Sequence, residues 1–258
     1  MSGGPRLRAI AFDLWETLIT NTPELSAGQK QLRLERMERI LRQGGYGGTA
    51  EQIEMAHRRS WHRCQELYWA ADRDVSCRTQ IDHFLEALEL EISDEATLDA
   101  LEQAYSGAAV EVLPSTINGA AAVLEEVKRR GLRVGLISNT GRTPGYALRE
   151  ILDRVGLARF FDSMVFSNEH GECKPRQSIF EALRKSLGVG FDEMLFVGDN
   201  LYVDVHGAQQ CGMRAVHFLP DKRGTAVAPP VDHGHEIEPD ATIKDLRELP
   251  AVIDALRS

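Results

Sequence analysis

The alternation of short apolar segments with amphipathic helical segments constrains the fold of this chain most strongly. After residue 113 the two kinds of segment follow one another up to the C-terminus. Strands that alternate with helices form a parallel sheet with helices on both faces, so we predict an α/β fold with a Rossmann-like sheet. The predicted strands span 8–14, 133–138, 163–167, 193–199 and 214–219; the predicted helices span 117–131, 144–156, 176–188, 201–212 and 243–256.

A long helical stretch separates the first predicted strand from the others. Helical spacing of Leu32, Met37, Ile40 and Leu41 indicates a helix that ends at the glycine pair 44–45. Further helical segments are predicted near 50–71, 78–91 and 94–109. We therefore predict two domains, an α/β core made of residues 1–19 and 113–258 and a helical domain made of residues 20–112.

Composition excludes several classes of function. The 258 residues include 30 basic and 39 acidic side chains, and a net charge of −9 disfavours nucleic-acid binding. No apolar run approaches the 18 or so residues that a membrane span needs, and the N-terminus does not resemble a signal peptide. The four cysteines are scattered, which indicates buried thiols rather than a zinc site. We expect a cytoplasmic protein, monomeric or homodimeric, without nucleic-acid or membrane partners.

Polar residues follow the carboxyl ends of the predicted strands, where ligands bind in such sheets. Asp13 ends the first strand, Ser138 and Asn139 the second and Asp199 the fourth, while Lys174 comes after the third. Paired carboxylates suit Mg²⁺, a hard cation that also takes substrate phosphate oxygens. An aspartate at such a place can also act as a nucleophile and form an aspartyl-phosphate.

The order of four motifs resembles that of the haloacid dehalogenase (HAD) superfamily. The motifs are FDLWETL, LISN, CKP and VGDNLYVDVHGA, and the helical stretch 20–112 lies where that superfamily places its C1 cap. The resemblance implies a hydrolase, most members being phosphatases, which acts on a small, anionic, phosphorylated substrate with Mg²⁺ as cofactor.

The resemblance also implies roles for individual residues. Asp13 would be the nucleophile and a Mg²⁺ ligand, joined by the backbone carbonyl of Trp15 and the carboxylate of Asp199. Ser138 and Asn139 would hold the transferring group, and Lys174 would stabilise its charge. Thr17 would brace the nucleophile loop. Asp204 and Asn200 would support Lys174 or the metal.

Trp15 departs from the phosphatase pattern. Phosphatases of this superfamily carry an acid/base aspartate at that position, and loss of such a group costs about 10²–10⁴ in rate. The leaving group could need little protonation, Glu16, His57 or His62 could replace the missing acid, or hydrolysis could be weak or lost, which would leave a binding protein.

Two residues favour different chemistries. Haloacid dehalogenases have an aromatic residue in place of the acid/base aspartate, so Trp15 favours cleavage of a carbon–halogen or similar bond. Those enzymes lack the metal carboxylate, so Asp199 favours phosphoryl transfer. We weigh Asp199 more heavily, because two adjacent carboxylates are costly without a cation. The prediction is a Mg²⁺-dependent phosphatase; the alternatives are a dehalogenase-like enzyme and a weakly catalytic or non-catalytic binding protein.

Two further segments carry candidate residues. In segment 56–74, Arg58, His62, Gln65 and Trp69 have near-helical spacing, so one face could look into the site or else be a solvated surface. The loop residues His233, His235 and Glu236 imitate metal ligands, but we interpret their Pro/Gly-rich segment, 224–241, as a surface loop.

Overall fold

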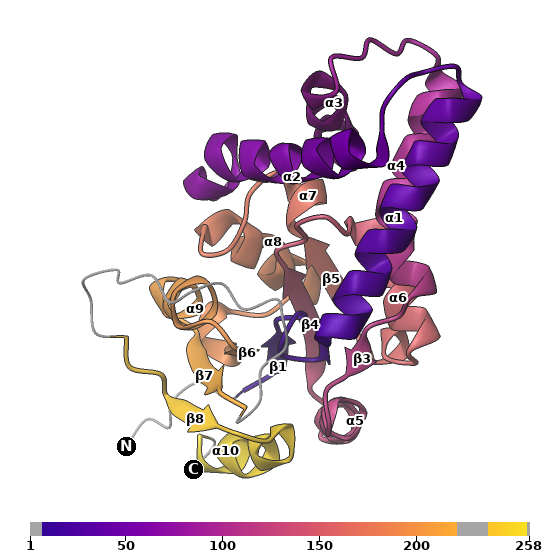
Figure 1. The fold of residues 1–258 in the computed structure, drawn as a ribbon. Helices are drawn as coiled ribbons and strands as arrows, with labels where there is room; N and C mark the ends of the chain where they lie inside the picture. The colour runs from indigo at the N-terminus through magenta and orange to yellow at the C-terminus, as the bar shows by residue number, and fades with distance from the viewer. Residues whose placement is uncertain (1–6, 221–236, 257–258) are drawn as a thin grey trace.

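A computed structural model describes residues 7–220 and 237–256. Its centre is a six-stranded parallel sheet in the order β5-β4-β1-β6-β7-β8, as Figure 1 shows. The strands are β1 (Ala9–Phe12), β4 (Arg133–Ser138), β5 (Ser163–Phe166), β6 (Met194–Gly198), β7 (Arg214–Phe218) and β8 (Ala241–Ile243). The predicted α/β class with a parallel, Rossmann-like sheet is confirmed.

Helices cover both faces of the sheet, because side chains along each strand alternate between them. Ile10 and Phe12 of β1 point into one apolar core, while Ala9 and Ala11 point into the other. The first core is closed by α5 (Ala120–Arg129), α6 (Gly145–Arg154) and α10 (Leu249–Ala255), and the second by α8 (Gln177–Leu187) and α9 (Gly207–Gln210).

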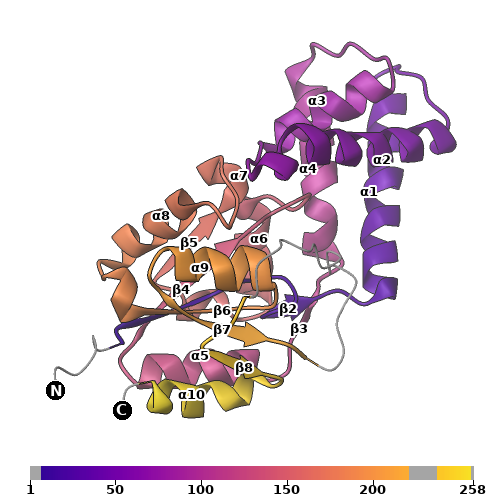
Figure 2. The ribbon, with the colours of Figure 1, turned by 90° about the vertical axis from the view of Figure 1, so that its left-hand side faces the viewer.

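Four helices form a separate layer, which we call the cap. Figure 2 shows it apart from the sheet and the helices that cover the sheet. They are α1 (Pro23–Gln43), α2 (Ala50–Leu67), α3 (Cys77–Ala87) and α4 (Glu95–Glu111). These helices bury an apolar cluster of their own that includes Met37, Ile53, Phe84, Leu101 and Tyr105. The cap thus has its own apolar core, and the chain enters and leaves it through residues 19–22 and 112–116.

Short elements account for the differences from the predicted boundaries. β2 (Ile19–Thr20) pairs antiparallel with β3 (Ser115–Thr116), so the two chain crossings into the cap lie side by side. The predicted helix 243–256 is wrong at its start, because β8 and a 3-10 turn at Leu246–Glu248 precede α10. The predicted helix 201–212 is instead a π-helix at Leu201–His206, followed by α9.

Two predictions about composition have a structural counterpart. Cys64, Cys77 and Cys173 are buried free thiols, whereas Cys211 is partly exposed. No helix within residues 7–220 and 237–256 is long and apolar enough to cross a membrane. His233, His235 and Glu236 lie outside the described residues.

Candidate active site

The buried ammonium of Lys174 joins two carboxylates at the carboxyl end of the sheet. Its Nζ lies 2.6 Å from Oδ1 of Asp13, which directly follows β1, and 2.7 Å from Oδ1 of Asp204 in the π-helix. It also donates to the backbone carbonyl of Ile137 in β4, at 3.1 Å. Lys174 is 1% exposed and Asp13 is 7% exposed. Three elements that are distant in sequence therefore converge on one cation.

Burial and charge set the ionisation of this pair. Burial raises the pKa of Asp13 to about 6, because the stabilising charge of Lys174 does not fully offset desolvation and the nearby Asp204 adds repulsion. Burial alone would lower the pKa of Lys174, but the carboxylates of Asp13 and Asp204 raise it above its ordinary value. Lys174 is therefore a permanent positive charge beside the carboxylate of Asp13.

Asp199 completes a cluster of three carboxylates. One oxygen each from Asp13, Asp199 and Asp204 lies within 4.8 Å of the others. Asp199 follows β6, and the π-helix turns Asp204 back beneath that strand end, where its Oδ2 accepts from the backbone N–H of Asn200 at 3.0 Å. Gly198 permits this approach, since a Cβ there would lie 2.4 Å from the Asp204 carboxyl group.

Asn200 shapes the same turn. Its side-chain oxygen accepts from the backbone N–H groups of Tyr202 and Val203, at 2.9 and 3.1 Å, and so caps the π-helix. Asn200 therefore acts here on the backbone that carries Asp204.

The other predicted site residues surround the ion pair. The hydroxyl of Thr17 donates to Oδ2 of Asp13 at 3.2 Å, which fixes the carboxylate opposite Lys174. Ser138 is fully buried at the end of β4. Asn139 uses both ends of its amide on the backbone of Lys174, with Oδ1 accepting at 2.9 Å and Nδ2 donating at 3.1 Å. Asn139 thus positions the segment that carries Lys174.

Trp15, two residues after Asp13, lines a cavity of about 580 Å³ between the core and the cap, whereas Asp13 and Lys174 are absent from its described lining. Its partly buried ring packs against the first core of the sheet. The cavity is bounded by core residues and by residues of α1 and α2; these are Trp15, Asn21, Ser26, Gln29, Lys30, Arg33, Glu54, His57, Arg58, Trp61, Asn139, Thr140, Gly141, Arg142 and Thr143.

Two of the three side chains considered as a replacement acid, Glu16 and His57, are engaged in other contacts. Glu16 is buried and accepts from the hydroxyl of Thr20 at 2.9 and 3.0 Å. His57 lines the cavity, but burial and the charges of Arg142 and Arg33 lower its pKa to about 2. A neutral His57 accepts from Nη1 of Arg142 at 3.0 Å, so its Nε2 lone pair is occupied.

The predicted cap face is only partly correct. Arg58 lines the cavity, whereas His62 and Gln65 are exposed and absent from its described lining. Trp69 lies beyond the end of α2, where its Nε1 donates to Asp74 at 2.7 Å. The cavity face of α2 instead comprises Glu54, His57, Arg58 and Trp61. It is rotated from the predicted face because the apolar side of α2 packs on the cap core.

The loop after β4 connects the core to the cap through three consecutive residues, and we call residues 140–142 the seam loop. The hydroxyl of Thr140 donates to Asp74 at 3.0 Å, and the carbonyl of Gly141 accepts from Gln80 at 2.8 Å. Arg142 donates to His57 and, at 2.9 Å, to the hydroxyl of Tyr105. Sequence reasoning missed all three, because nothing in LISNTGR marks a contact with a distant helix.

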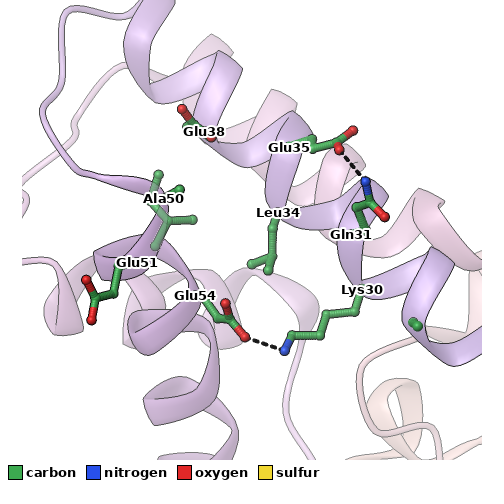
Figure 3. Close-up of a pocket in the computed structure, with 10 residues that line it drawn as sticks. Lys30, Gln31, Leu34, Glu35, Glu38, Ala50, Glu51 and Glu54 are labelled. Carbon is green, nitrogen blue, oxygen red and sulfur yellow. Dashed lines mark hydrogen bonds and ion pairs between the residues drawn. The ribbon is translucent and has the colours of Figure 1, made fainter.

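A second pocket of about 510 Å³ lies on the outer side of the cap between α1 and α2 (Figure 3). It shares Lys30 and Glu54 with the larger cavity, and these two residues form an ion pair. Its remaining charged groups, Glu35, Glu38 and Glu51, are acidic and exposed in part or in full. The Lys30–Glu54 pair therefore lies between an acidic outer pocket and the cavity above Trp15.

Several relatives carry the names of phosphatases. The chain is 30% identical over 251 residues to a ribulose-1,5-bisphosphate 5-phosphatase of Halopiger xanaduensis, which covers 93% of this chain and 97% of that protein. It is 28% identical to a glyceraldehyde 3-phosphate phosphatase of Pyrococcus furiosus, over 83% of this chain and 81% of that protein. A phosphoserine phosphatase of Thermus thermophilus is 38% identical over about half of each chain.

Solved structures share the fold at low sequence identity. A HAD phosphatase from Thermococcus onnurineus superposes with a TM-score of 0.61 and 21% identity, covering 98% of this chain and 100% of that one. A 2-haloacid dehalogenase from Pseudomonas syringae gives a TM-score of 0.66, also at 21% identity, covering 96% and 99%. The family model of haloacid dehalogenase-like hydrolases matches residues 7–212. The four motifs lie in order at the carboxyl ends of the strands, and the family model covers most of the chain. The chain therefore belongs to the haloacid dehalogenase-like hydrolases.

Proposed function

We propose that this hydrolase removes phosphate from small phosphorylated metabolites, with Mg²⁺ as cofactor and Asp13 as nucleophile. The observation that carries the proposal is the buried contact of Lys174 with Asp13 and Asp204, beside Asp199. The named substrates of the relatives, which include a sugar bisphosphate and a triose phosphate, agree with this class.

The three carboxylates fit a magnesium ion. Their oxygens converge within 4.8 Å, and Lys174 balances one of the three negative charges. Hard oxygen donors are what Mg²⁺ prefers. Asp13, Asp199 and the carbonyl of Trp15 would hold the ion, with Asp204 holding Lys174. When bound, it would neutralise charge on the phosphoryl oxygens and on Asp13.

Asp13 would attack phosphorus through a carboxylate oxygen. That step forms an O–P bond to Asp13 and breaks the ester O–P bond, and water then hydrolyses the acyl phosphate to inorganic phosphate. Lys174 and Thr17 hold the two oxygens of Asp13, which fixes the direction of attack. Ser138 ends the adjacent strand and would contact the transferring group, beside Asn139.

The leaving oxygen would receive its proton from water rather than from a carboxylic acid. Among the described residues that line the cavity, Glu54 is the only carboxylate, and it pairs with Lys30. His57 is neutral and bonded to Arg142. We therefore infer that, among phosphate esters that bind with similar affinity, those with good leaving groups are hydrolysed fastest.

A substrate screen tests this function. Phosphate release is measured with sugar phosphates, phosphoserine, acyl phosphates and p-nitrophenyl phosphate, each with and without Mg²⁺, for the wild type and Asp13→Asn. We expect release that needs both Mg²⁺ and Asp13. Release by Asp13→Asn at the wild-type rate would overturn the assignment of the nucleophile.

A dehalogenase-like activity is the second candidate. Trp15 favours it, because a halide leaves without a proton and the cavity lining supplies no free carboxylic acid among the described residues. The same screen therefore includes 2-chloropropionate and 2-bromopropionate. Halide release that is independent of Mg²⁺, without phosphate release from any ester, would select this candidate over the first.

A further inference from the structure

The cap end of the cavity is positively charged although the chain carries a net charge of −9. Lys30, Arg33, Arg58 and Arg142 line it, against the single carboxylate of Glu54, which Lys30 pairs with. Within residues 7–220 and 237–256, neither Arg33 nor Arg142 contacts a carboxylate. Two guanidinium groups are therefore held near each other without a counter-charge.

Arg33 is a buried charge whose position is fixed by contacts with the cap. Its side chain comes from α1, is 5% exposed, and donates from Nε to the carbonyl of Tyr105 at 2.7 Å. The guanidinium carbon lies 5.3 Å from the centre of the Tyr105 ring. Among the described residues its terminal nitrogens have no hydrogen-bond partner, while the residue itself lines the cavity. Burial lowers the pKa of Arg33 to about 10, which still leaves it charged at neutral pH.

Arg142 approaches the same region from the core. Its guanidinium stacks on Trp61, with its carbon 4.4 Å from the ring centre, and one terminal nitrogen, Nη1, holds His57 and Tyr105. These contacts fix the plane of the group and leave Nε and Nη2 without a described partner. A guanidinium held in this way is suited to bidentate binding of a carboxylate or phosphate.

We propose that Arg33 and Arg142 bind a second anionic group of the substrate, at the end opposite the phosphate that Asp13 attacks. The proposal rests on the phosphatase function proposed above and narrows it to esters with two anionic ends. A phosphate or a carboxylate would satisfy the two guanidinium groups. Because Arg142 belongs to the seam loop and Arg33 to the cap, such a substrate would bridge the core and the cap.

Wild-type protein gives the first test. We compare kcat/KM for ribulose 1,5-bisphosphate with ribulose 5-phosphate, and for 3-phosphoglycerate with glycerol 3-phosphate, at fixed Mg²⁺ and ionic strength. Charge-assisted hydrogen bonds predict a preference of about 10- to 100-fold for the partner with two anionic ends. The first pair reports a second phosphate and the second pair a carboxylate. Hydrolysis without a preference in either pair would overturn the proposal and leave the phosphatase function intact.

Variants assign the preference to the two arginines. Arg142→Gln and Arg33→Gln should each reduce it about tenfold or more, and Arg142→Lys should restore part of it because the charge is kept. Arg59→Gln is the matched control, since Arg59 is exposed on α2 outside the described lining. A full preference in both glutamine variants, with folding verified by thermal melting, would contradict the assignment.

A binding measurement separates this proposal from the catalytic one. Calorimetry on Asp13→Asn with Mg²⁺ compares the affinity for ribulose 1,5-bisphosphate and ribulose 5-phosphate without turnover. Tighter binding of the bisphosphate, lost in Asp13→Asn/Arg142→Gln, supports the second anion site even if the wild type releases no phosphate. Equal affinities in this background, together with equal kcat/KM values in both substrate pairs, contradict it.

Discussion

In the proposed mechanism, Trp15 is the residue that limits protonation of the leaving group. The motif order implies an acid/base aspartate at this position, whereas Glu16 bonds Thr20 and His57 bonds Arg142. Trp15→Asp should raise kcat/KM for alkyl phosphates by about 10²-fold, the lower end for general acid catalysis, since the pocket is not shaped for a carboxylate. The increase for p-nitrophenyl phosphate should be smaller, because its leaving group departs without a proton.

Folding must be monitored in the same experiment. Deleting a fully buried tryptophan costs about 3–5 kcal/mol, and Trp15 is only partly buried, so the loss of stability should be smaller. Trp15→Phe serves as the control because it removes the indole without adding an acid. Equal rate changes for alkyl and aryl substrates in a folded Trp15→Asp protein would mean that no general acid is missing.

His57 makes stability depend on pH. Its pKa is about 2 in the folded protein but about 6.5 in the unfolded chain, so only the unfolded state takes up a proton as the pH falls below 6.5. This group therefore contributes stability above pH 6.5 that is lost as the pH falls. His57 should lower the free energy of unfolding by about 1.4 kcal/mol between pH 7.5 and pH 5.5.

Urea unfolding at the two pH values measures this contribution. His57→Gln keeps an acceptor for Arg142 and removes the titration, so its loss of stability on acidification should be smaller by that amount. His62→Gln is the control, since His62 is exposed on the same helix. An equal loss in the wild type and in His57→Gln would show that His57 is protonated in the folded protein.

At the scale of elements, the seam loop fixes the cap on the sheet. Asp74, in the segment between α2 and α3, is 7% exposed and accepts from Trp69, Thr140 and Ser167. Asp74→Ala leaves buried donors from both layers unsatisfied, which should cost about 1–3 kcal/mol. Amide hydrogen exchange in residues 139–143 should also accelerate.

Asp82→Ala provides the comparison, because Asp82 is exposed on α3. Thermal melting and hydrogen exchange are measured on both variants. The two variants could have the same melting temperature, and residues 139–143 of Asp74→Ala could exchange amide hydrogens as slowly as in the wild type. In that case the contact of Asp74 with the core does not hold the cap.

The predictability of these elements follows from the range of the interactions that define them. β1, β4 and β6 are continuous apolar runs, so their ends, and with them Asp13, Ser138 and Asp199, could be located from the sequence. β2, β3 and β8 have two or three residues and exist through pairing with distant segments, which no local pattern signals. Arg33 and Arg142 were missed for the same reason, since their polar neighbours belong to other elements.

At the scale of the whole molecule, the three carboxylates meet only in the folded chain. Asp13 and Asp199 follow different strands, and Asp204 reaches them through the π-helix. A cation that needs all of these elements binds the native state alone and stabilises it by mass action. Mg²⁺ should therefore shift the thermal unfolding of the entire core and not only the segment around the site.

The expected shift can be bounded. At a free Mg²⁺ concentration one hundred times its Kd, the stabilisation is about 2.7 kcal/mol, which corresponds to roughly 5–10 °C for a protein of this size. Asp199→Asn removes a charge and a ligand oxygen, so its melting temperature should respond far less to Mg²⁺. Glu35→Gln is the control, because Glu35 lies in the outer pocket of the cap. Equal Mg²⁺-dependent shifts in the wild type and Asp199→Asn would place the cation elsewhere, since mass action requires loss of affinity to appear as loss of stabilisation.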